Sequence, residues 1–207
     1  MSPEREWWLR VPAVLLGPRA VFVALRDDAR EQIDARQEPV LALVLLAGVA
    51  AVLGTSTAGT LFDNPEYDAL LAAVWAVVAG GLYAFAGYWL IGGALYLGAR
   101  GVGGLGDYRR ARHVLAFAAT PLALSLLVLW PLQLAAFGTD VFERGGSDEG
   151  AAGTLFDALE LGFALWSAAL LLVGVRAVHG WSWLRSLGAL ALVALFLAAF
   201  AYLPSVL

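Results

Sequence analysis

The chain has 207 residues, of which 61% are hydrophobic and 14% are charged, and its formal net charge is −4. A soluble domain is about 45–50% apolar and about 25% charged, so this composition excludes a single aqueous core and predicts a membrane protein. The chain contains no cysteine, which excludes disulfides, thiolate catalysis and cysteine-ligated metal sites.

The basic residues are distributed unevenly along the chain. All thirteen are arginine, and they lie between long apolar runs in alternation. Six precede the first run, four lie between the second and third runs, and two lie between the fourth and fifth. Between the third and fourth runs there is only Arg144. Arginine enrichment on alternate loops is the positive-inside pattern. We therefore expect a multi-pass protein of the cell membrane with a cytoplasmic N-terminus and an external C-terminus.

Residues 1–38 are expected to form a cytoplasmic segment that contains an amphipathic helix. From Pro18 to Glu38 the intervening residues are mostly charged, and apolar side chains recur at helical spacing, at Val21, Phe22, Leu25, Ala29 and Ile33. This pattern is typical of a helix that lies on a membrane surface. Trp7 and Trp8, just before it, suit the headgroup region. The alternative is that the helix docks on the cytoplasmic face of the bundle itself.

Residues 39–207 are expected to form an all-α membrane bundle of five transmembrane helices. A hydrocarbon core of about 30 Å requires roughly 20 apolar helical residues, and five apolar runs approach or exceed this length. The predicted spans are about 39–60, 69–99, 114–138, 155–178 and 186–206. They are expected to be helices because backbone polar groups in lipid must be bonded within the segment.

The second span is unusually long and carries a regular set of small residues. Its 31 uncharged residues would form a helix of about 46 Å, which must tilt, kink or project from the hydrocarbon. The small residues recur every seven positions, at Ala73, Gly80, Gly87, Ala94 and Gly101. Because small residues let another helix approach closely, they predict a helix-packing stripe. The alternative is a groove for lipid or another ligand.

The third span contains Pro121 and Pro131. Each proline removes an intrahelical hydrogen bond, so the pair predicts a bent membrane helix. The alternative is a broken helix that lines a cavity, as in some transporters.

Three charged residues form a candidate intramembrane polar site: Asp157, Glu160 and Arg176. Fifteen residues separate Glu160 from Arg176, which is too few to cross the bilayer, so either one of them lies at membrane depth or the helix is short and locally thins the bilayer. Ionisable residues at that depth are candidates for function. Asp157 and Glu160 share a helix face, and together they suggest a proton or cation site. The alternative is a pair of interfacial carboxylates at a helix N-terminus, where the helix dipole stabilises negative charge.

Five further residues are expected to contact lipid headgroups: Arg109, Arg110, Arg112, Trp181 and Trp183. Arginine attracts anionic lipid and tryptophan favours the interface. The two histidines of the chain, His113 and His179, have no ligand-spaced partner. We find no catalytic motif and no nucleic-acid signature, so we expect no enzyme, no cofactor, no metal and no nucleic-acid partner.

Several stretches resemble the Yip (Ypt-interacting protein) family of small multispan membrane proteins, including its prokaryotic members. They are GPRAVFVAL (17–25), GYWLIGGALYLGARGVGG (87–104), HVLAFAATPLAL (113–124) and LELGFALWSAALLLVGVRAVHGWSWLRSLGAL (159–190). The resemblance implies a five-span fold and a non-enzymatic membrane role. Eukaryotic members bind small GTPases through a longer N-terminal region. Only about 38 residues precede the first span here, and the acidic-Leu-Tyr-Gly-Pro motif is missing, so GTPase binding is not supported.

The function expected from these features is a membrane scaffold or membrane-organising role, with membrane shaping or trafficking as the process served. Its partners would be the lipid bilayer and either a second copy of the chain or another membrane protein. The alternative is a small transporter, channel or lipid-translocating protein that uses the prolines, Glu160 and the small-residue groove.

Overall fold

The computed structural model describes residues 3–28, 38–54, 69–104, 106–142, 147 and 150–202, and within these ranges the regular structure is helical. The elements are α1 (Pro3–Leu16), α2 (Pro18–Asp27), α4 (Glu38–Leu53), α6 (Ala69–Gly101), α7 (Tyr108–Ala118), α8 (Thr120–Phe137), the 3₁₀ helix η1 (Gly138–Phe142), α9 (Ala151–His179) and α10 (Trp183–Tyr202). The all-α prediction is confirmed for this part of the chain.

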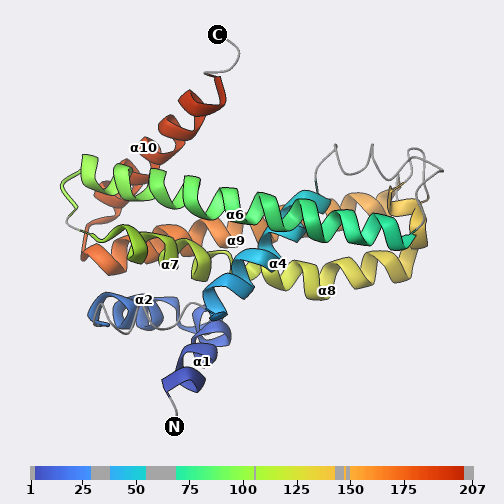
Figure 1. Ribbon diagram of the computed structural model, residues 1–207, viewed down its shortest axis with the longest axis horizontal. Coiled ribbons are helices and arrows are strands. Elements are labelled where there is room, and N and C mark those ends of the chain that lie inside the picture. The colour runs from blue at the N-terminus through green and yellow to red at the C-terminus, as the bar shows by residue number, and fades with distance from the viewer. Residues whose placement is uncertain are drawn as a thin grey trace.

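The long helices α6 and α9 run along the long axis of the molecule, and α7 followed by α8 forms a third row beside them (Figure 1). The 33 residues of α6 extend about 50 Å, which exceeds a hydrocarbon core of about 30 Å. In the described ranges, four segments are long and apolar enough to cross a membrane: Val74–Gly101, Tyr108–Phe137, Ala151–His179 and Trp183–Phe200.

The first predicted span is represented by α4, which has only 16 residues. At 1.5 Å per residue this helix is about 24 Å long, less than the hydrocarbon thickness. Residues 55–60 of the predicted span lie outside the described residues. The structure therefore supports four spans in the described part of the chain, and the fifth stays a prediction.

The two prolines of the third span behave differently. Pro121 lies in the first turn of α8, directly after the break at Ala119 that separates α7 from α8. At this break the hydroxyl of Thr120 donates to the carbonyl of Phe117 over 2.7 Å and so bonds a carbonyl at the end of α7. Pro131, in contrast, lies inside α8, which continues to Phe137.

The N-terminal region forms two helices, α1 and α2, instead of the single helix predicted for residues 18–38. Helix α2 ends at Asp27, and the predicted helical positions 29–37 lie outside the described residues. The apolar positions Val21, Phe22 and Leu25 are all buried. A Cβ added to Gly174 of α9 would lie 3.0 Å from the ring of Phe22, so α2 packs closely on α9. Over its described part, residues 18–28, the segment docks on the other helices, as the second interpretation expects, and the remainder of the prediction stays untested.

Small residues of α6 allow two other helices to approach it. A Cβ on Gly80 would lie 2.6 Å from the Cα of Val49 in α4. Near the other end of α6, a Cβ on Gly98 would lie 2.7 Å from the carbonyl oxygen of Ala189 in α10. Beyond this crossing α10 leads away from the other helices toward the C-terminus (Figure 1).

The predicted stripe is therefore divided between neighbours. Gly80 faces α4, and a Cβ on Gly101 would lie 2.8 Å from Leu192 of α10. Ala94 is buried, whereas a Cβ on Gly87 would approach only Ile91 of its own helix, at 3.7 Å. The side chain of Ala73 lies outside the described part of the structure.

Candidate functional site

Asp157, Glu160 and Gln133 come together near the end of the bundle where α8 ends and α9 begins. Asp157 and Glu160 lie one turn apart in the N-terminal part of α9, and Gln133 lies in the last two turns of α8. The side-chain amide of Gln133 donates a hydrogen bond of 3.3 Å from Nε2 to Oε1 of Glu160. Gln133 is only 6% exposed, and its Oε1 is buried without a hydrogen-bond partner.

Two cavities meet at these residues. The first, of about 280 Å³, is lined by Asp157 and Glu160 together with Ser125 and Trp130 of α8 and the end of α4. The second, of about 230 Å³, is lined by Asp157 and Gln133 together with Thr154. Asp157 borders both cavities. Because water occupies about 30 Å³ in the liquid, each cavity has room for several water molecules.

Arg176, the third residue of the predicted site, lies elsewhere. It is sixteen residues beyond Glu160 in the same continuous helix, which corresponds to about 24 Å. Its guanidinium lies over the ring of Trp183, 4.5 Å from the centroid. The structure therefore separates Arg176 from the two carboxylates. This distance is less than the hydrocarbon thickness of about 30 Å, so the prediction that this interval is shorter than a membrane crossing stands as a prediction.

The opposite end of the bundle is rich in arginine, and Arg112 of α7 is enclosed there by three aromatic side chains. Its guanidinium lies 3.9 Å from the ring centroid of Trp89, with Tyr88 and Tyr108 at 4.9 and 4.7 Å. Its stem packs on Gly92, where an added Cβ would lie 2.4 Å from Cγ of Arg112. With 6% exposure, Arg112 contacts protein where lipid headgroup contact was predicted.

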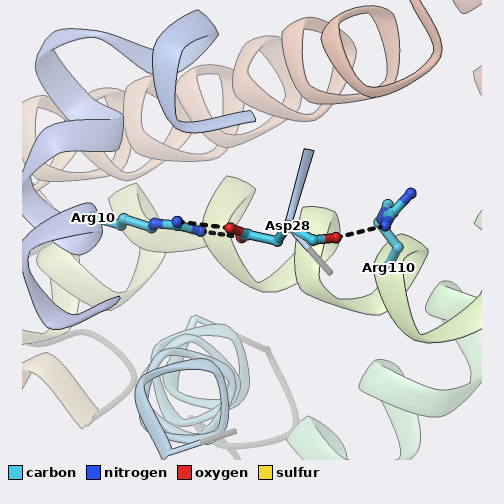
Figure 2. Close-up of polar contacts among 3 residues, drawn as sticks. All are labelled: Arg10, Asp28 and Arg110. Carbon is cyan, nitrogen blue, oxygen red and sulfur yellow. Dashed lines mark hydrogen bonds and ion pairs between the residues drawn. The ribbon is translucent and has the colours of Figure 1, made fainter. Parts of the chain in front are cut away.

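Arg110, on the same helix, holds the end of α2 through Asp28 (Figure 2). It donates to the backbone carbonyl of Asp28 over 3.2 Å. The carboxylate of Asp28 accepts two hydrogen bonds from Arg10 of α1, one of them 3.1 Å long. Arg10 also lies over the ring of Trp7 at 4.7 Å. We call Arg10, Asp28 and Arg110 the N-terminal bridge, because they join α1, α2 and α7.

Trp7 is buried, which is contrary to the prediction of a headgroup position. It is 2% exposed and packs edge-on against His113 of α7, with a ring separation of 5.8 Å. Phe117 lies 6.1 Å from the same ring. Trp8, by contrast, is exposed, as a headgroup position requires.

The turn between α9 and α10 and the start of α10 carry the two tryptophans that were predicted to contact headgroups, Trp181 and Trp183. Trp181 stacks on His179, with 4.2 Å between the ring centroids. The guanidinium of Arg185 also lies over the Trp181 ring, 4.5 Å from its centroid. Arg185 also donates to the carbonyl oxygen of Val102 over 2.7 Å, which ties the turn to the end of α6. Trp183 is half exposed, so it remains available to lipid.

Arg109 stabilises the start of α7. Its backbone N–H donates to the side chain of Asp107 over 3.4 Å, which caps the helix. Its carbonyl oxygen accepts a hydrogen bond of 2.8 Å from Nδ1 of His113. His179 bonds a carbonyl of its own helix in the same way, at Val175. In the ranges that the structure describes, no three His, Asp or Glu side chains gather as metal ligands.

Sequence reasoning missed two of these arrangements. Gln133 was not among the predicted site residues, although an amide within an apolar run is itself a signal of a polar partner. Helix α1 and the N-terminal bridge were also missed. No sequence signal connects Arg10 to Asp28, because the pairing depends on how α1 and α2 fold back on α7.

Comparison with known proteins gives one match. Neither the curated proteins nor the solved structures contain a match to this chain. A family model described as the Yip1 domain matches residues 10–203, which is nearly the whole chain. The match includes α1 from Arg10 onward, α2 and the membrane helices described above. The chain therefore belongs to the Yip1 domain family, and its apolar helices are those of an integral, multi-pass membrane protein.

Proposed function

We propose that this protein is a non-enzymatic membrane organiser that engages one leaflet through α1. The observation that carries this proposal is the exposed face of α1. Among residues 7–16, the part of α1 whose side chains are described, the exposed positions follow helical spacing and are all apolar: Trp8, Leu9, Pro12, Ala13 and Leu16. An apolar helix face with tryptophan at its edge suits the boundary between headgroups and acyl chains.

The opposite face of α1 explains how the helix is held. Trp7 and Val14 are buried against the bundle, and Arg10 belongs to the N-terminal bridge. Helix α1 runs across the long axis along which α6 and α9 lie (Figure 1). A helix fixed in this direction at the arginine-rich end would lie in the plane of the membrane. The predicted interfacial role therefore passes from α2, whose apolar face is buried, to α1.

Fluorescent probes on α1 are expected to report a lipid environment. The chain lacks cysteine, so Leu9→Cys and Leu16→Cys each provide one labelling site in the full-length protein. In proteoliposomes, an environment-sensitive probe at either position should emit at shorter wavelength and be quenched by nitroxide lipids. Arg26→Cys, on the exposed side of α2, is the control and should remain in water. A probe at Leu16 that behaves like the one at Arg26 would contradict the proposal.

Membrane shaping is tested separately with charged substitutions. In Leu9→Glu/Leu16→Glu the apolar face of α1 is lost, while the buried face and the bridge are retained. We expect vesicles that contain this variant to be larger and less curved than those with the unsubstituted protein, at equal protein density. Equal vesicle diameters would leave α1 as an anchor without a shaping role.

A small transporter or channel is the second candidate function, and the polar cavities favour it. Ser167 lies two turns beyond Glu160 on α9, and its buried hydroxyl has no hydrogen-bond partner. A polar path from Glu160 toward the arginine-rich end would include it. Flux of protons or inorganic cations into proteoliposomes that is lost in Glu160→Gln would favour transport over organisation.

A further inference from the structure

We propose that Asp157, Glu160 and Gln133 form a binding site for a hydrated divalent cation of the Ca²⁺ or Mg²⁺ class. The site lies at the end of the bundle opposite the arginine-rich end, and it does not depend on the role proposed for α1. Its three side chains come from two helices that pack on each other, α8 and α9.

Gln133 provides an acceptor that the protein leaves unused. Its side chain is 94% buried, its Nε2 is bonded to Glu160, and its Oε1 has no partner. Buried polar atoms in native proteins are nearly always bonded to protein, water or an ion. The residue also lines the second cavity beside Asp157. A cation beside Gln133 would give its Oε1 the partner that the protein does not supply.

The two carboxylates supply the charge. Asp157 and Glu160 are one helical turn apart and both line the larger cavity. Like charges at this spacing repel each other. No arginine or histidine is among the described residues that line either cavity, and Arg176 lies about 24 Å away along α9. A bound cation would offset the repulsion that no described basic residue neutralises.

The donor atoms indicate the class of cation. Carboxylate and amide oxygens suit Ca²⁺ and Mg²⁺, whereas zinc and copper sites draw on histidine or cysteine. Among the described residues, three side chains provide protein ligands, so water would provide the others. Glu160 lines the cavity of about 280 Å³ and Gln133 lines the cavity of about 230 Å³, and Asp157 lines both, so the waters of a cation held at Asp157 would have room on either side. This pattern, with one or two carboxylates and several retained waters, is usual for Mg²⁺ and is tolerated by Ca²⁺.

The test uses Tb³⁺ as a luminescent substitute for Ca²⁺, with the full-length protein in phosphatidylcholine nanodiscs. Trp130 lines the larger cavity and can transfer excitation to a bound Tb³⁺ ion. We expect saturable Tb³⁺ emission on tryptophan excitation, and displacement of Tb³⁺ by Ca²⁺ or Mg²⁺. Glu160→Gln and Asp157→Asn keep the side-chain shape and should weaken Tb³⁺ binding about tenfold or more. Trp130→Phe should reduce the emission while Ca²⁺ still raises the melting temperature.

The matched control is Asp140→Asn, which removes a carboxylate of η1 that lines neither cavity. It should leave Tb³⁺ affinity unchanged. Equal affinity in Asp157→Asn, Glu160→Gln and the unsubstituted protein would overturn the proposal. Displacement of Tb³⁺ by ethylammonium but by neither Ca²⁺ nor Mg²⁺ would overturn it as well, in favour of an ammonium site. Elution of each variant at the volume of the folded protein separates lost binding from lost structure.

Discussion

Replacing Asp28 with alanine is expected to lower the free energy for opening α1 and α2 away from the bundle by about 3 kcal/mol. The side chains of Arg10 and Asp28 are 11% and 12% exposed, so the substitution leaves a largely buried guanidinium without its carboxylate. Breaking a buried ion pair in this way is costly because the remaining charge is not solvated. Hydrogen exchange of the α2 amides, followed by mass spectrometry, measures the change directly.

The neighbouring aspartate offers a matched control. Asp27 pairs with Arg26, but these side chains are 60% and 42% exposed. An exposed pair contributes about 1 kcal/mol or less, so Asp27→Ala should change the opening free energy little. The double variant Arg10→Ala/Asp28→Ala should be more stable than the sum of the single effects predicts, because no unpaired charge remains. Equal protection of α2 in Asp28→Ala and Asp27→Ala would show that the N-terminal bridge does not hold the two helices.

Replacing Gly80 with alanine is expected to separate α4 from α6 and to lower the free energy of unfolding by about 1–3 kcal/mol. The added Cβ would lie 2.6 Å from both the Cα and Cγ2 of Val49. Because one of these atoms belongs to the backbone, the contact is relieved only if the whole helix moves. Unfolding of the protein in mixed micelles with increasing SDS measures the loss.

Gly87→Ala is the control on the same helix and in the same predicted stripe. The nearest atom to its Cβ would be Cδ1 of Ile91, at 3.7 Å. Alanine is more favourable than glycine inside a helix by up to about 1 kcal/mol, so this variant should be as stable as the unsubstituted protein or more stable. If both variants lost the same stability, the effect would arise from helix propensity or lipid contact, and the α4–α6 packing would not be its cause.

Much of the membrane architecture could be predicted from composition and the lengths of the apolar runs. The span predicted at 69–99 is α6, Ala69–Gly101, and the span at 155–178 lies within α9, Ala151–His179. These predictions succeed because lipid imposes both the helical state and a minimum length on each segment. Of the first predicted span, 39–60, the structure describes α4, which ends at Leu53.

The partners of individual side chains could not be predicted in the same way. Glu160 and Arg176 were identified because the interval between them is shorter than a membrane crossing, and Asp157 because it shares a helix face with Glu160; the structure places Arg176 about 24 Å along α9 from Glu160. Gln133 is their neighbour because α8 packs against α9 in one particular register. Arg112 similarly appeared to be a headgroup residue until the fold enclosed it among Tyr88, Trp89 and Tyr108.

The sequence by itself determined that the chain is an α-helical membrane protein with most of its arginines at one end. These properties follow from local hydropathy and charge, which act on each segment separately. Only the tertiary structure decided which apolar faces are covered. The apolar face of α2 is buried on α9, whereas α1 buries one apolar face and exposes another. Periodicity identifies an apolar face, but whether protein or lipid covers it depends on the packing of distant segments.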